Sequence, residues 1–113
     1  MTEPLDKTPD SDAQIRERVL DNAKKYVLKD RNTSYGRPED NFARIARRWN
    51  VFVKNKYDIE LNLQPVDIAM MMADMKLARL ENSPTHEDSW TDLAGYAACG
   101  AGIALTSKTP RTW

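Results

Sequence analysis

Apolar residues recur at intervals of three and four positions along most of the chain, which is the spacing of one face of an α-helix. The first run extends from about Ser11 to Leu28, and Ser11 is of the residue type that caps helix amino termini. Its apolar positions are Ile15, Val19, Ala23, Tyr26 and Val27. We therefore expect a first helix over residues 11–28, after a charged, proline-containing arm at residues 1–10.

A second helix is predicted from Pro38 to about Val53. Proline suits a first helical turn, because the N–H that it lacks would be unpaired there. Glu39 and Asp40 follow it and favour the positive end of the helix dipole. The positions expected to face inward are Phe42, Ile45, Ala46, Trp49 and Phe52 or Val53. The segment DRNTSYGRP separates the two helices and is rich in turn-forming residues.

The second half of the chain predicts two more helices with short connections. The segments are a linker at residues 57–64, a third helix from Pro65 to about Leu80 or Glu81, a loop at residues 81–85, a fourth helix from about His86 to Leu105, and a tail at residues 106–113. Short connections indicate neighbours that run in opposite directions. We expect an all-α fold, an antiparallel bundle of about four helices, with one helical domain over residues 11–105.

Composition agrees with a single domain and removes several other classes. The chain has 113 residues, of which 41% are apolar and 30% charged, as in ordinary globular proteins. Its one cysteine, Cys99, excludes an intramolecular disulfide and suits a reducing compartment. No apolar run approaches the roughly 20 residues that span a bilayer, and the start MTEPLDKTPDSD lacks the layout of a signal peptide. We expect a cytoplasmic protein with no membrane partner.

The formal net charge is zero, but the charges are unevenly distributed. Positions 29–56 hold eight basic and three acidic side chains, whereas positions 57–105 hold eight acidic and two basic ones. This asymmetry permits an anion site in the first part and a metal or a basic neighbour in the second. Because the total is zero, we do not expect nucleic acid as a partner.

Candidate ligand-binding residues lie around the start of the second helix. Arg37 and Arg44 offer guanidinium forks that match phosphate oxygens in pairs. Tyr35 offers a ring for base stacking and a hydroxyl for hydrogen bonding. The arginines also fit a solvated face or ion pairs with acidic helices, and Tyr35 also fits a tight turn whose ring fills the core. The spacing does not choose between these interpretations.

Cations and carboxylates also face each other across the turn between the third and fourth helices. Lys76 and Arg79 are one turn apart, as are Asp88 and Asp92, and Tyr96 shares the face of the two aspartates. These side chains could hold a nucleotide, with Asp88 and Asp92 orienting the cations, binding ribose or coordinating one Mg²⁺. They could instead be salt bridges that join the helical hairpin. Both interpretations stay open.

Glycines inside the predicted fourth helix need a reason, because each costs about 1 kcal/mol relative to alanine. Gly95, Ala98 and Gly102 lie along one narrow strip, which allows another backbone to approach closely. That neighbour belongs either to the same chain or to a second copy. We expect a homo-oligomer.

Three stretches together resemble a known family. YGRPEDNFARIARRW, DIAMMMADMKLARL and HEDSWTDLAGYAA follow the pattern Y-G-x-P-x-x-N-F, then D-x-A-x-x-M, K-x-x-R-L and D-S-W-x-D-x-A-G-Y-A. This pattern is similar to that of short phage and prophage proteins built on a domain of unknown function, over residues 25–100. The resemblance implies a phage protein in the cytoplasm of a bacterial host.

A more distant resemblance suggests nucleotide chemistry. The Y-G, K-x-x-R and D-x-x-x-D-L-x-x-Y-A elements are similar to a phage domain associated with nucleotide modification and to the MazG-like nucleoside triphosphate pyrophosphatases. The latter are oligomeric all-α enzymes that hold Mg²⁺ with E-E-x-x-E on one helix and E-x-x-D on the next. This chain lacks E-E-x-x-E, and Asp88 and Asp92 are what remains of the second motif. Fewer carboxylates should weaken metal-assisted hydrolysis without weakening phosphate binding.

The resemblances and the residues together predict a phage protein that binds a nucleotide or nucleotide-derived small molecule. Sequestering a host immune nucleotide signal, an anti-defence role, is one use of such binding. The predicted ligand-binding residues are Tyr35, Arg37, Arg44, Lys76, Arg79, Asp88, Asp92 and Tyr96. Two alternatives stay open, which are a Mg²⁺-dependent MazG-like pyrophosphohydrolase and a small protein- or DNA-interaction module. In the enzyme alternative, the metal carboxylates are Asp67, Asp74, Asp88 and Asp92.

Overall fold

The computed structural model describes residues 9–30 and 37–106, and every regular element in these ranges is helical. The elements are α1 (Asp12–Lys25), a π-helical turn η2 (Tyr26–Asp30), α3 (Pro38–Tyr57), α4 (Pro65–Asn82) and α5 (Glu87–Thr106). The predicted all-α class is confirmed. Helix α5 includes Thr106, which the sequence had placed in the tail.

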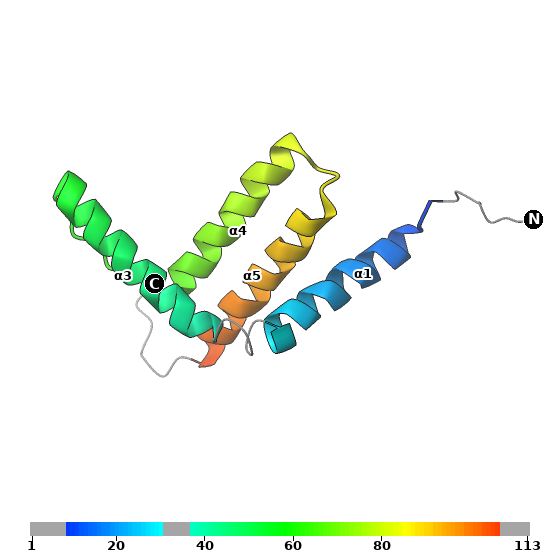
Figure 1. The fold of residues 1–113 in the computed structure, drawn as a ribbon, viewed down its shortest axis with the longest axis horizontal. Helices are drawn as coiled ribbons and strands as arrows, with labels where there is room; N and C mark the ends of the chain where they lie inside the picture. The colour runs from blue at the N-terminus through cyan, green and yellow to red at the C-terminus, as the bar shows by residue number, and fades with distance from the viewer. Residues whose placement is uncertain (1–8, 31–36, 107–113) are drawn as a thin grey trace, which may run out of the picture.

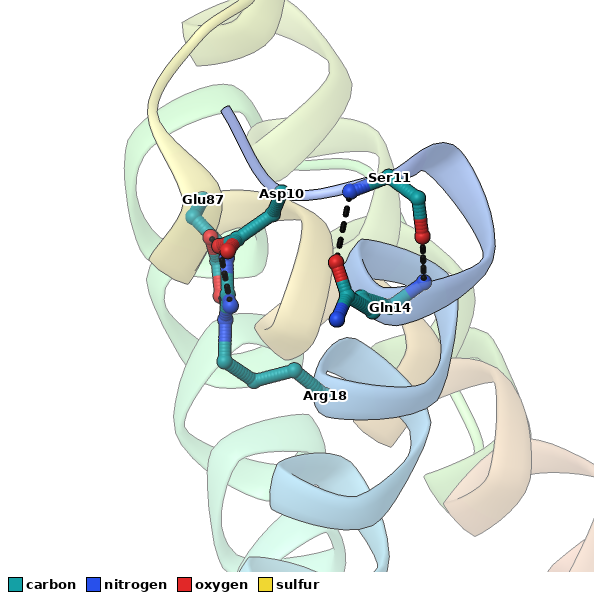
Figure 2. Close-up of polar contacts among 5 residues, drawn as sticks. All are labelled: Asp10, Ser11, Gln14, Arg18 and Glu87. Atoms are coloured by element: carbon teal, nitrogen blue, oxygen red, sulfur yellow. Dashed lines mark hydrogen bonds and ion pairs between the residues drawn. The ribbon is translucent and has the colours of Figure 1, made fainter. Parts of the chain in front are cut away.

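Local chemistry accounts for where the helices begin. Ser11 and Gln14 form a capping box, in which the Gln14 backbone N–H donates to Ser11 Oγ at 3.1 Å and the Ser11 N–H donates to Gln14 Oε1 at 2.7 Å (Figure 2). Pro38 and Pro65 open α3 and α4 as predicted. Before α5, the His86 side chain contacts that of Ser89, three residues later, with 2.8 Å between Nδ1 and Oγ.

The helices form a bundle around α5. Helices α4 and α5 lie side by side as an antiparallel hairpin, and α1 lies along the opposite side of α5 (Figure 1). Helix α3 contacts α4 and then diverges from it (Figure 1). The main core cluster forms where α3, α4 and α5 meet, from the buried Phe42, Ala46, Ile68 and Ala69. The radius of gyration is 18.0 Å, against about 13 Å for a compact domain of about 100 residues.

The second half of α3 corrects one prediction. The helix extends four residues beyond the predicted end, to Tyr57, and closes at Asp58 in the left-handed conformation with φ of 56°. Trp49, predicted to face inward, is 37% exposed. Of the two alternatives predicted for the next inward position, Phe52 is 59% exposed, whereas Val53 is half-buried. The reason is that no helix of the described chain covers this part of α3.

The linker returns along α3 instead. The Asn50 side chain holds it, accepting from the Leu63 N–H at 3.0 Å and donating to the Leu63 carbonyl at 3.3 Å. This pairing satisfies the backbone N–H and C=O of Leu63, which have no partner strand. From Arg47 onward, α3 and the returning residues 58–64 form a projecting arm (residues 47–64) (Figure 1).

The glycine strip of α5 has a neighbour within the chain. A Cβ on Gly95 would lie 3.3 Å from Val27 Cγ1 of η2. Gly100, which is outside the strip, is also close to a neighbour, because a Cβ there would lie 3.2 Å from Ala69 Cβ of α4. Both contacts are tight, so these glycines allow close approach of neighbouring elements. Nothing lies within 4 Å of a Cβ on Gly102. The strip therefore serves intrachain packing at Gly95.

An ion-paired arginine ties α1 to the start of α5. Arg18 Nε and Nη2 donate to the two carboxylate oxygens of Glu87 at 2.8 Å, and Arg18 Nη1 donates to Asp10 at 2.7 Å (Figure 2). This two-pronged geometry is the strong form of an arginine–carboxylate pair. The hydrogen bonds that Glu87 accepts from Arg18 lower the pKa of Glu87, and the bonds that Arg18 donates to Glu87 and Asp10 raise the pKa of Arg18.

We expect this pair to make stability depend on acid pH. Because the folded-state pKa of Glu87 is lowered, the stabilisation is present above the ordinary glutamate value of 4.5 and is lost as pH falls through the folded pKa. Arg18→Gln should therefore lower the melting temperature at pH 7 and reduce its decline between pH 5 and pH 3. Arg16→Gln removes a more exposed pair with Asp12 and is the control. Equal pH profiles for wild type and Arg18→Gln would contradict this expectation.

Candidate functional site

A cavity of about 140 Å³ lies between α1, η2, α3, α4 and α5. Its wall is mainly apolar, with Phe42 and Ile45 from α3, Met72 from α4 and Cys99 from α5. The ring of Tyr96 lies 6.2 Å from that of Phe42, centroid to centroid, at 43°. An apolar cavity with a few polar groups is the usual form of a small-molecule site.

Thr91 gives the cavity an unusual polar group. Its side chain lines the wall, the residue is 2% exposed, and Oγ1 has no hydrogen-bond partner among the described residues. A buried hydroxyl without a partner costs about 1–3 kcal/mol. Such a group is rare in folded proteins, and its donor and acceptor are left unused in a residue of the cavity wall.

Lys76 forms a salt bridge across the helical hairpin, one of the two arrangements that the sequence left open. Lys76 Nζ lies 2.9 Å from Asp92 Oδ2, and the two side chains are 11% and 36% exposed. The pair joins α4 to α5, and Asp92 also lines the cavity. Lys76 thus meets a carboxylate of the cavity wall and balances its charge.

Two of the predicted arginines lie beside residues of the cavity wall. Arg44 Nη1 donates to Asn41 Oδ1 at 3.0 Å, and Asn41 lines the cavity. Arg37 lies in an adjoining shallow groove, which shares Val27, Pro38 and Cys99 with the cavity. Arg37 Nη2 donates to Glu39 at 3.0 Å, with both side chains largely exposed. The groove includes the amino terminus of α3, where the helix dipole favours an anion.

Of the remaining predicted residues, Arg79 and Asp88 are not brought to the cavity. Arg79 lines a different hollow, beside His86 at the turn between α4 and α5. Asp88 is exposed in the first turn of α5. Tyr96 does line the cavity, whereas Tyr35 lies outside the described residues. The set predicted from sequence is therefore split between two ends of the α4–α5 hairpin.

The carboxylates predicted for a metal lie apart. Asp67 accepts a hydrogen bond from the Gln64 N–H at 2.8 Å and caps α4, and Asp74 is exposed on the same helix. Within residues 9–30 and 37–106, no group of three or more His, Cys, Asp or Glu side chains is placed to hold a metal ion. The Mg²⁺ site at Asp88 and Asp92 stays a prediction.

Sequence reasoning missed Thr91 and Asn41. A threonine in mid-helix reads as an ordinary helical residue, and only the packing of the neighbouring helices shows that its hydroxyl is left without a partner. One signal was available, since Thr91 stands four residues before Gly95 and shares its face. Asn41 lies one turn before Ile45 on the same face and could have been grouped with it.

Comparison with known proteins places the chain in a family. Residues 18–104 match the domain of unknown function DUF6378, and the chain belongs to that family. Similar curated proteins are Gene 55 protein of Mycobacterium phage D29, 36% identical over 101 residues, and Gene 55 protein of Mycobacterium phage L5, 30% identical over 100 residues. The matches cover 88% and 84% of this chain but only 63% and 61% of those proteins. The predicted link to a phage family built on a domain of unknown function is confirmed.

No solved structure matches the chain. No helix within the described residues is long and apolar enough to cross a membrane.

Proposed function

We propose that this phage-family domain binds a nucleotide or nucleotide-derived small molecule, with a ring of the ligand in the α5 cavity. The observation that carries the proposal is Thr91, which lines the cavity and whose buried hydroxyl has no partner among the described residues. A ligand that hydrogen-bonds to it would recover free energy that the unliganded protein loses.

The size and lining of the cavity suit a single flat ring. Its volume is about 140 Å³, and a cavity of about 150 Å³ lined by apolar side chains accepts benzene. Phe42 and Tyr96 supply aromatic surface. Thr91, Asn41 and Asp92 supply the polar contacts that distinguish a nucleobase from a plain hydrocarbon ring.

The adjoining groove supplies a place for phosphate. Arg37 and the amino terminus of α3 lie there, and Arg44 donates a hydrogen bond to Asn41 of the cavity wall. A phosphate oxygen would replace Glu39 as the partner of Arg37. A ligand with a ring and a phosphate separated by a sugar would span cavity and groove.

The test is mass spectrometry of a mixed nucleotide pool, including cyclic nucleotides, incubated with the full chain and Mg²⁺. Fractions retained by the protein and released from it are analysed separately. We expect one class to be retained intact. Arg37→Gln should reduce its retention about tenfold, the loss of about 1.4 kcal/mol, whereas Arg79→Gln at the far end of the hairpin should not change it. A pool that is neither retained nor converted would contradict the proposal.

The same experiment decides the enzyme alternative. A Mg²⁺-dependent pyrophosphohydrolase would release a nucleoside monophosphate from a triphosphate. The contact of Asp92 with Lys76 favours binding alone, because that carboxylate is already paired with a cation. Release of monophosphate, abolished by Asp88→Asn with the fold intact, would replace the binding proposal with the hydrolase.

Binding without conversion gives a phage protein a simple use. A protein that retains a nucleotide lowers its free concentration in proportion to the protein present. Sequestration of a host immune nucleotide signal is therefore the biological role that fits this proposal. A signalling nucleotide retained intact from the pool would be the expected result.

A further inference from the structure

The projecting arm carries an exposed apolar surface that the described chain leaves uncovered. Trp49, Val51 and Phe52 are 37%, 57% and 59% exposed, and they line an open hollow together with Arg47 and Arg48. All five residues belong to α3, so no other element of the described chain contributes to this hollow. A grouped apolar surface of this kind marks an interaction site.

A second surface of the same chain has the opposite charge. Met70 and Leu77 on the outer face of α4 are 59% and 48% exposed. Asp74 and Glu81 alternate with them at intervals of three and four residues and are exposed too. This stripe, residues 70, 74, 77 and 81, joins apolar side chains to carboxylates and contains no base.

We propose that the arm of one copy packs against the α4 stripe of a second copy. The apolar side chains would meet at the centre, and Arg47 and Arg48 would face Asp74 and Glu81 of the other chain. Because each chain carries both surfaces, a two-fold axis forms the contact twice and closes the dimer. The formal net charge of zero adds no long-range repulsion between copies.

The charges of the arm favour a second copy over nucleic acid. Lys54 on the arm is already paired, with its Nζ 2.7 Å from Asp58 and 3.2 Å from Glu60. The remaining bases therefore flank an aromatic surface rather than forming a continuous basic track. The buried apolar side chains of the described chain are also few, and half of them are alanines, namely Ala23, Phe42, Ala46, Ile68, Ala69 and Leu80. A second copy would add apolar contacts to this small core.

The test is sedimentation equilibrium of the full chain. We expect a dimer. Phe52→Glu should raise the dissociation constant of the dimer about tenfold or more, because it places a charge at the centre of the contact. Leu105→Glu, on a side chain 77% exposed at the end of α5, is the matched control and should leave association unchanged. Circular dichroism confirms that both variants keep their helices.

A charge exchange tests the pairing itself. Changing Arg47 and Arg48 to Glu should separate the dimer, and adding Asp74→Lys with Glu81→Lys should restore it. A monomeric wild type, or a dimer equally indifferent to Phe52→Glu and Leu105→Glu, would overturn the proposal. So would binding of the wild-type arm to duplex DNA that falls steeply with salt while the protein stays monomeric.

Discussion

Replacing Ile68 with alanine is expected to cost about 3–4 kcal/mol of folding free energy, because the substitution removes buried apolar atoms and leaves a cavity in the core. Ile68 is fully buried and joins Phe42, Ala46 and Ala69 where α3, α4 and α5 meet. A domain of this size has a total stability of about 5–15 kcal/mol. The loss would therefore remove a large part of the stability that holds the cavity walls together.

Urea unfolding, followed by circular dichroism, measures this loss. Ile68→Val should cost only about 1 kcal/mol, because it removes a single methylene. Leu105→Ala removes a side chain that is 77% exposed and is the surface control, expected within about 0.5 kcal/mol of wild type. Equal losses for Ile68→Ala and Leu105→Ala would show that the core lies elsewhere.

Asp92→Asn is expected to lower the free energy of unfolding by about 2 kcal/mol. It leaves the nearly buried Lys76 ammonium without a counter-charge, and breaking a fully buried pair costs about 3–5 kcal/mol. Because the Asp92 side chain is 36% exposed, water recovers part of this loss. The same variant should also weaken ligand binding, since Asp92 lines the cavity.

A double-mutant cycle isolates the pair. Lys76→Met combined with Asp92→Asn removes the unpaired charge, so the double variant should be within about 1 kcal/mol of wild type. The control is Asp58→Asn, which breaks a more exposed contact with Lys54 and should cost much less. Additive losses at Lys76 and Asp92 would mean that the two side chains stabilise the fold independently.

The helix starts could be predicted because their causes are local. Ser11, Pro38 and Pro65 mark amino termini through capping and through the missing proline N–H, which depend on the neighbouring residues alone. The exposure of Trp49 could not be predicted, because periodicity shows which residues share a face but not what covers that face.

The site was predicted only in part for a similar reason. Lys76 and Arg79 are one helical turn apart, yet one meets Asp92 and the other lies at the turn near His86. The partner of each side chain depends on how α4 and α5 are staggered, and the spacing along one helix does not predict that stagger. Thr91 was missed because an unpartnered hydroxyl is defined by its three-dimensional surroundings.

The central claim is that the Thr91 cavity binds a ligand, and Thr91→Val tests it most directly. Valine keeps the shape and removes the unpartnered hydroxyl, so the unliganded protein should gain about 1 kcal/mol of stability. Retention of the nucleotide that wild type selects should fall about tenfold, the loss of one hydrogen bond of about 1.4 kcal/mol. A protein made more stable and less able to bind is the result that we predict. Unchanged binding, or a loss of stability, would contradict the assignment of this cavity as the ligand site.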